Sequence, residues 1–141
     1  MPKSNLSHYQ DFTRLDQWLF YLENLHSSEI DLGLTRISLV AERLAIDLSF
    51  AKVITVAGTN GKGTTCAFIE NALLSHDVNQ VNCSDKGFIA KKSKNTVAVY
   101  SSPHIERFNE RLRLNKTDVS DQLLIDAFQK IEAAREEISL T

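Results

Sequence analysis

The sequence is poor in cysteine and carries little net charge. Its two cysteines, Cys66 and Cys83, do not make a disulfide framework, and neither belongs to a CxxC pair. Because 16 basic residues stand against 18 acidic ones, for a formal net charge of -2, the strongly basic footprint of a nucleic-acid-binding domain is excluded. No apolar run approaches the roughly 20 residues of a membrane-spanning helix, and residues 1–5 lead into polar sequence that lacks the apolar stretch of a secretory signal. We therefore expect a soluble, cytoplasmic protein with neither nucleic-acid nor membrane partners.

What the sequence does contain is enough apolar material for a packed domain. Its 141 residues suit one ordinary domain. Hydrophobic residues make up 43% of the chain and charged residues 24%, a balance that argues against global disorder. No internal repeat or linker divides the chain.

Apolar residues at helical spacing predict four helices. They fall within positions 12–25, 37–46, 64–75 and from about 120 onward. Ser120 or Asp118 can cap the last helix. Trp18 and Phe12 are expected in the core rather than as a platform for a ligand.

Two segments read as short strands. Residues 52–57 are rich in β-branched side chains, and residues 97–100 read Val-Ala-Val-Tyr. The order strand, glycine-rich loop, helix, strand is a βαβ unit. We therefore expect an α/β fold with a P-loop-type parallel sheet, flanking helices and a right-handed crossover.

Residues 80–96 interrupt this unit with a polar, locally basic stretch that has no clear periodicity. Crossover loops usually have about 2–6 residues, so the stretch is interpreted as an insertion. Two interpretations stay open, a solvated surface loop and a basic binding loop.

The strongest motif is the glycine-rich loop between the first strand and its helix. Residues 58–65 read Gly-Thr-Asn-Gly-Lys-Gly-Thr-Thr. Glycines allow backbone N–H groups to approach a phosphate, and the following helix turns its positive end toward that anion. Lys62 can reach the β- and γ-phosphates of a nucleotide, and the hydroxyl of Thr64 can hold Mg²⁺.

The loop departs from the general pattern G-x-x-x-x-G-K-[ST] at two positions. Val56 stands in place of the first glycine, and Gly63 stands where the hydroxyl residue is expected. An ordinary strand-to-helix turn and an unrelated P-loop kinase or GTPase are therefore kept as alternatives.

Four stretches together resemble the Mur ligase superfamily, in particular its folate branch, the bifunctional dihydrofolate synthase/folylpolyglutamate synthases. The loop from Ala57 to Thr65 looks like their nucleotide loop. Three further stretches agree, in the family's order along the chain: Tyr21–His26 followed by Ile30–Leu34, then Val99–His104, then Glu110–Arg113.

The resemblance implies an ATP-dependent amide ligase of folate biosynthesis. Such enzymes phosphorylate the carboxylate of a pteroate or folate, and the amino group of L-glutamate then attacks the acyl phosphate. Dihydropteroate, tetrahydrofolate and L-glutamate are the implied substrates, with ATP and Mg²⁺ as cofactors. Positioning and charge neutralisation carry most of such a phosphoryl transfer.

The same resemblance implies roles for particular residues. Lys62 is the expected catalytic residue on the terminal phosphates, and the hydroxyls of Thr64 and Ser102 are expected to hold the metal. The remaining positions fall into two sets. The nucleotide-binding set is Gly58, Thr59, Asn60, Gly61, Lys62, Gly63, Thr64 and Thr65. The substrate-binding set is Asp31, Leu32, Gly33, Leu34 and His104.

Several of these residues also have simpler interpretations. Asp31 can be a turn or cap residue, and Ser102 with Pro103 can simply end a strand. His104 can be an ordinary surface residue. The arginines at 107, 111 and 113 are more often a solvated charged face than a ligand clamp.

Family members are considerably longer than this chain. Residues 1–141 would thus be the N-terminal part of a Mur-ligase-like ATP-binding domain, incomplete relative to the family's ATPase domain and without its C-terminal domain. The extra stretch at 80–96 would be a lineage-specific loop or relic sequence. The alternative function is a catalytically inactive nucleotide-binding fragment or pseudoenzyme, and the oligomeric state stays open.

Overall fold

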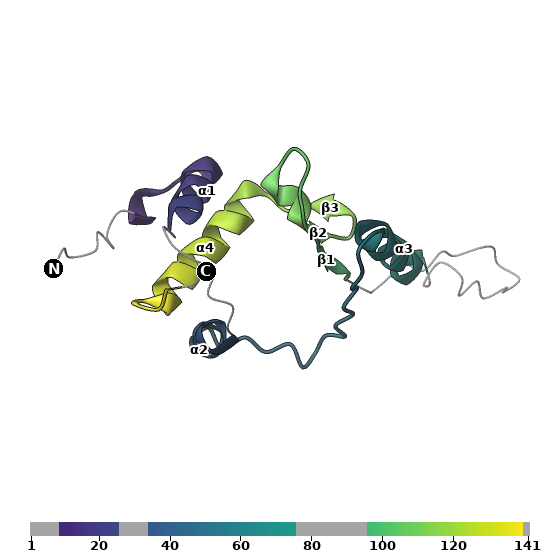
Figure 1. Cartoon of the computed structure of the whole chain (residues 1–141), viewed down its shortest axis with the longest axis horizontal. Coiled ribbons are helices and arrows are strands. Elements are labelled where there is room, and N and C mark those ends of the chain that lie inside the picture. The colour runs from purple at the N-terminus through teal and green to yellow at the C-terminus, as the bar shows by residue number, and fades with distance from the viewer. Residues whose placement is uncertain (1–8, 26–33, 76–95, 140–141) are drawn as a thin grey trace, which may run out of the picture. The chain divides into compact units, whose positions relative to one another are not determined.

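The computed structural model describes residues 9–25, 34–75 and 96–139 (Figure 1). The chain divides into two compact units. Residues 1–52 and 120–141 form one, called the helical unit, and residues 53–119 form the other, called the loop–sheet unit. Asp31, Leu32, Gly33 and all but the last residue of the 80–96 stretch lie outside the described residues.

Three helices make up the described part of the helical unit. They are α1 (Leu15–Asn24), α2 (Leu34–Arg43) and α4 (Asp121–Arg135), and a short 3-10 helix at Tyr9–Asp11 precedes α1. Helix α4 contacts both α1 and α2. The three predicted helices are thus confirmed, although α2 begins and ends a few residues earlier than the apolar spacing predicts.

Polar groups fix the starts of two helices. The Ser120 hydroxyl accepts a hydrogen bond from the Leu123 N–H at 3.3 Å, which confirms Ser120 as the N-cap of α4. At α1 the side-chain oxygen of Gln17 accepts the N–H groups of Thr13 and Arg14, both at 3.1 Å. Each contact satisfies backbone donors that a helix leaves unpaired at its start.

Trp18 is the centre of the core of the helical unit. Its side chain is 0% exposed, and the other buried apolar residues of this unit are Leu15, Val40, Leu124 and Ile125. Four rings lie around the indole at centroid distances of 5.5–6.0 Å: Tyr9, Phe12, Tyr21 and Phe128. Tilted and edge-to-face rings at this spacing are favourable, so Trp18 acts as a core residue, as expected.

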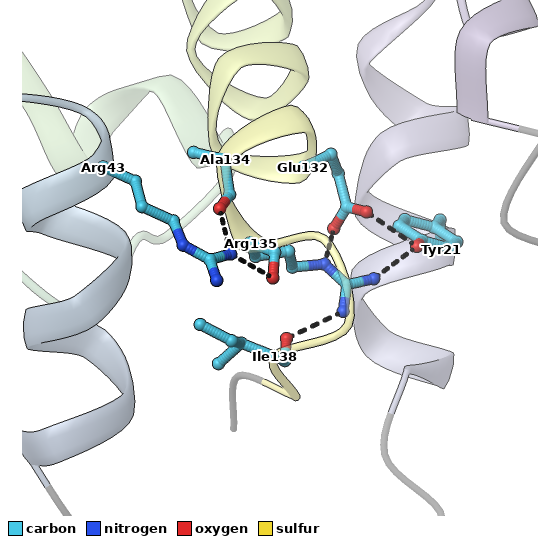
Figure 2. Close-up of polar contacts among 6 residues, drawn as sticks. All are labelled: Tyr21, Arg43, Glu132, Ala134, Arg135 and Ile138. Atoms are coloured by element: carbon cyan, nitrogen blue, oxygen red, sulfur yellow. Dashed lines mark hydrogen bonds and ion pairs between the residues drawn. The ribbon is translucent and has the colours of Figure 1, made fainter.

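A buried polar network joins α1 to α4 (Figure 2). The Arg135 guanidinium donates to the Glu132 carboxylate at 2.6 Å, to the Tyr21 hydroxyl at 2.9 Å and to the Ile138 carbonyl at 3.1 Å. The Tyr21 hydroxyl in turn donates to Glu132 at 3.1 Å. Burial and the nearby Glu132 charge raise the pKa of Tyr21, and the hydrogen bond to Glu132 raises the pKa of Arg135. The network therefore buries charge while satisfying its donors and acceptors.

The last carbonyls of α4 accept hydrogen bonds from an arginine of α2. Arg43 donates to the carbonyls of Ala134 and Arg135 at 2.9 and 3.2 Å (Figure 2) and pairs with Glu136 at 3.2 Å. These carbonyls have no partner within their own helix, and a cation is favourable at that end.

The loop–sheet unit combines one helix with a small antiparallel sheet. Helix α3 (Lys62–Ser75) is followed by β1 (Ala98–Tyr100), a 3-10 helix at Phe108–Arg111, β2 (Leu112–Leu114) and β3 (Thr117–Asp118). The strand order is β1-β2-β3, with Val99 opposite Arg113 and Arg113 opposite Asp118. Asn115 and Lys116, at φ 49 and 69, make the two-residue turn between β2 and β3.

The predicted strand at 97–100 is confirmed as β1, but its partner is antiparallel. Residues 52–57 have no regular secondary structure in the described part of the chain. Val53 and Ile54 there are 71% and 57% exposed. A strand requires a neighbour for its backbone hydrogen bonds, and β1 makes its bonds with β2 instead. The α/β character is confirmed, while the parallel sheet stays a prediction.

Among the described residues, no helix is both long enough and apolar enough to cross a membrane.

Candidate functional site

The glycine-rich loop leads directly into α3. The first hydrogen bond of this helix runs from the Thr65 N–H to the Gly61 carbonyl at 2.9 Å. The N–H groups before Thr65 therefore have no partner within the helix and are available to an anion. Gly61 has a φ of +75°, a conformation that side chains with a Cβ rarely adopt, so glycine is needed for the loop to turn into the helix here.

Lys62 folds back over the loop. Its Nζ donates to the Gly58 carbonyl at 2.7 Å and to the Thr59 carbonyl at 3.3 Å. An ammonium group has three donors, so one is left for another acceptor. The side chain is exposed, and its charge lies over the same turn whose N–H groups face outward at the start of α3.

The hydroxyl residues of the loop are also accessible. Thr64 and Thr65 are exposed in the first turn of α3. An added Cβ at Gly63 would meet no atom within 4 Å, so the backbone is open on that side. The residues expected to bind a nucleotide, from Gly58 to Thr65, are thus gathered in one exposed turn.

The two residues expected to hold a metal ion, Thr64 and Ser102, both carry hydroxyl groups. In the parts of the chain that the structure describes, no three His, Cys, Asp or Glu side chains are placed to hold a metal ion. Ser102 is exposed and precedes Pro103 through a cis peptide bond. Hydroxyl ligands of this kind are compatible with Mg²⁺, which commonly takes its remaining ligands from water and phosphate oxygens.

His104 belongs to a small cluster with Phe108 and Arg111. The Arg111 Nε–H donates to the His104 Nδ1 at 2.8 Å. The Arg111 guanidinium lies 5.0 Å from the Phe108 ring centroid, and the rings of His104 and Phe108 are 5.6 Å apart. All three side chains are half-buried, so His104 and Arg111 are partnered rather than freely solvated.

Glu110 organises the backbone between His104 and Phe108. Its carboxylate accepts the N–H groups of Ile105, Glu106 and Arg107 at 2.7, 2.9 and 2.7 Å. The hydrogen bonds from Ile105, Arg107 and Glu106 hold the pKa of Glu110 below its usual value. Sequence reasoning placed Glu110 only within a stretch resembling the folate ligases and gave it no role.

Glu70 is a second residue that sequence reasoning missed. Its side chain is 3% exposed on α3, where it accepts from Arg113 at 2.9 Å and from the Lys116 N–H at 2.8 Å. Arg113 is therefore an ion-pair partner rather than part of a solvated face. Phe68, an apolar residue of the same helix, is 73% exposed. An acid whose partners lie more than 40 residues away leaves no local signal in the sequence.

The expected substrate-binding residues are only partly described. Leu34 is the first residue of α2 and is 80% exposed. Asp31, Leu32 and Gly33 precede it outside the described residues. Their role, like the metal-binding role of Thr64 and Ser102, stays a prediction.

Solved structures similar to this chain include nucleotide-bound folylpolyglutamate synthase/dihydrofolate synthases. The chain matches Escherichia coli FolC in complex with DHPP and ADP with a TM-score of 0.72 and 45% identity, covering 92% of this chain and 27% of that one. It matches a bifunctional folylpolyglutamate synthase/dihydrofolate synthase with Mn, AMPPNP and L-glutamate bound with a TM-score of 0.72 and 44% identity, over 92% and 27% of the two chains. No protein-family model matches the sequence.

A curated relative found by sequence comparison has the same name as these solved structures, a dihydrofolate synthase/folylpolyglutamate synthase. The dihydrofolate synthase/folylpolyglutamate synthase of Escherichia coli K12 is 46% identical over 127 residues, which are 90% of this chain and 26% of the relative. The resemblance seen in the sequence is thereby confirmed: the chain is homologous to part of the bifunctional dihydrofolate synthase/folylpolyglutamate synthases. It spans about a quarter of the length of the curated relatives that it matches.

Proposed function

We propose that this chain supplies the phosphate-binding part of an ATP-dependent ligase that joins L-glutamate to the carboxylate of dihydropteroate or a folate through an acyl phosphate. The observation that carries the proposal is the exposed loop from Gly58 to Thr65, which opens α3 and carries Lys62. Relatives that match most of this chain are named dihydrofolate synthase/folylpolyglutamate synthase, and one similar structure was solved with Mn, AMPPNP and L-glutamate.

The loop provides three aids to phosphoryl transfer. Its N–H groups before Thr65 bind phosphate oxygens at the positive end of the helix. Lys62 exchanges the carbonyls of Gly58 and Thr59 for the terminal phosphates, where its charge offsets the charge that builds up during transfer. A divalent cation held by Thr64 and Ser102 would neutralise the phosphates further.

The substrate side of the site involves two segments. We infer that residues 31–34 line the pterin pocket and that His104 contacts the substrate. The half-buried, partnered position of His104 supports this assignment because such a side chain is held in one orientation.

We also propose that residues 1–141 are the N-terminal part of a Mur-ligase-like ATP-binding domain of a cytoplasmic enzyme. The exposed apolar side chains of Val53 and Ile54 support the predicted parallel sheet, since a buried strand of this composition is covered on both faces. The stretch at 80–96 is an insertion in this scheme.

Nucleotide binding tests the phosphate-binding role directly. Calorimetric titration of the 141-residue chain with ATP and Mg²⁺ should give measurable binding. The Lys62→Ala variant should bind about tenfold or more weakly, the size of a lost charged hydrogen bond. Lys52→Ala removes an exposed lysine outside the loop and should bind as wild type. If Lys62→Ala bound ATP as tightly as the wild type, the assignment of Lys62 to the nucleotide phosphates would be wrong.

A catalytically inactive nucleotide-binding fragment is the second candidate. ADP release that requires both dihydropteroate and L-glutamate would establish the ligase. Nucleotide binding without such release would establish the fragment.

A further inference from the structure

Arg111 donates a hydrogen bond to the Nδ1 nitrogen of the His104 ring. Arginine has five N–H donors and no acceptor, so the contact at 2.8 Å requires His104 Nδ1 to supply a lone pair. A neutral imidazole bound in this way carries its proton on Nε2. The hydrogen bond between Arg111 and His104, called the His104–Arg111 relay below, thus has a fixed direction, with Arg111 as the donor and His104 Nδ1 as the acceptor.

The surrounding contacts hold the relay in place. The Phe108 ring packs against both partners, with the guanidinium of Arg111 at 5.0 Å and the His104 ring at 5.6 Å. The Glu110 carboxylate accepts three N–H groups from the intervening residues 105–107. The segment between the two partners is therefore held by its own Glu110 carboxylate and by the hydrogen bond from the Asn109 amide to the Val119 carbonyl at 2.8 Å.

Within the described residues, the polar contact of His104 is at Nδ1, and no hydrogen bond is found at Nε2. The residue is only half-buried. A single N–H donor beside a permanent guanidinium charge is suited to an anionic oxygen, because hydrogen bonds to ionised groups are about twice as strong as neutral ones.

We propose that Arg111 is a positioning residue that fixes the His104 proton on Nε2, so that His104 presents one N–H donor to an anionic oxygen of the ligase substrates. This inference rests on the proposed function, which supplies three sources for that oxygen: the carboxylate of dihydropteroate, the carboxylates of L-glutamate and the phosphates of ATP. The shared chemistry is an anionic oxygen acceptor.

The tautomer can be measured without any ligand. Long-range ¹H–¹⁵N spectra of the histidine-labelled chain should give His104 as a single Nε2–H tautomer, with the signal assigned by its loss in His104→Gln. Arg111→Met should lose that single-tautomer pattern, Arg111→Lys should largely restore it, and Arg107→Met should leave it unchanged. A proton on Nδ1 in the wild type would overturn the proposal, as would an unchanged pattern in Arg111→Met.

Titration with each ligand then tests the purpose of the relay. One of dihydropteroate, L-glutamate and ATP with Mg²⁺, each added separately, should shift the His104 Nε2 resonance, and the one that does so identifies the source of the oxygen. Arg111→Met should weaken binding of that ligand about tenfold, and Arg111→Lys should recover most of the loss. A merely structural Arg111 would not move the tautomer signature and the affinity together.

The outcomes separate this inference from the function on which it rests. Ligand binding that leaves the Nε2 resonance in place overturns the positioning role alone, since Lys62-dependent nucleotide binding would still support the phosphate loop. A chain that binds none of these ligands overturns both the positioning role of Arg111 and the proposed function.

Discussion

The helical unit and the loop–sheet unit both bury charged groups, but they differ in how much apolar surface they bury. The helical unit encloses Trp18 completely among aromatic rings. Val119 is the only buried hydrophobic residue that the described part of the loop–sheet unit contributes. There the fixed points are polar: Glu70 with Arg113, and the Asn109 amide with the Val119 carbonyl at 2.8 Å.

This difference in buried apolar surface indicates that the two units have different roles. A packed aromatic core gives one unit most of its stability through burial of apolar area. Hydrogen bonds contribute less net free energy each, but they fix direction, which a binding loop requires. Substitutions in the helical unit should therefore act mainly on stability, and those in the loop–sheet unit mainly on local order and ligand contacts.

The largest expected effect is the loss of Trp18. Trp18→Ala should lower the free energy of unfolding by about 3–5 kcal/mol, because it removes a fully buried side chain and leaves a cavity. Urea denaturation followed by circular dichroism would measure the change. Phe20→Ala, an exposed position on the same helix, should change stability by less than about 0.5 kcal/mol. Equal effects at both positions would contradict the difference between core and surface.

A smaller loss is expected from Glu70. Glu70→Ala leaves the Arg113 guanidinium and the Lys116 N–H without their acceptor. Because Arg113 is partly exposed to water, the cost should be about 1–3 kcal/mol rather than that of a fully buried pair. Hydrogen exchange at the Lys116 amide should accelerate, while exchange in α4 should not. Glu106→Ala, an exposed acid in the same unit, serves as the matched control. An unprotected Lys116 amide in the wild type would refute the contact.

Trp18 and Glu70 also show which features can be predicted from the sequence and which cannot. The core role of Trp18 and the Ser120 cap follow from local spacing and side-chain chemistry, and both are found as expected. The strand at 97–100 was predicted correctly from its β-branched residues, but its antiparallel partner was not. Glu70 binds groups more than 40 residues away, whose positions only the fold determines. Glu110 binds N–H groups three to five residues before it, so its contact is local. The role of the Gly58–Thr65 loop came from its motif, whereas the Arg111 contact with His104 is visible only in the structure.

A gain in stability is expected at the turn between β2 and β3. Lys116 has a φ of 69°, which costs a residue with a Cβ about 1–2 kcal/mol. Glycine avoids that cost but loses more chain entropy on folding, so Lys116→Gly should stabilise by about 0.5–1 kcal/mol. It also keeps the N–H that binds Glu70. Thermal unfolding measures the gain. Lys130→Gly, in the exposed middle of α4, should instead cost about 1 kcal/mol. Destabilisation by both glycine substitutions would contradict the positive φ of Lys116 in the turn between β2 and β3.

The smallest and most local effect is the response of Glu110 to acid. Its pKa lies below the ordinary 4.5 because its carboxylate accepts the N–H groups of Ile105, Arg107 and Glu106. A group whose pKa is lower in the folded than in the unfolded chain contributes its full stability above the unfolded value. That contribution is lost as the pH falls through the folded pKa. The amides of residues 105–107 should therefore keep their chemical shifts at pH 5 and above and move together below about pH 4.5.

Asp47 in the helical unit offers a matched comparison for this titration. Its pKa is also lowered, chiefly by the hydrogen bond from the Ser49 N–H at 2.8 Å. The Ser49 amide should respond alone, whereas three amides should respond together around Glu110, because one carboxylate binds all three. Glu110→Gln should abolish the concerted response and leave that of Ser49 intact. Independent titration of the three amides in the wild type would mean that Glu110 does not hold the segment, and the support for the His104–Arg111 relay would then have to come from Phe108 and Asn109.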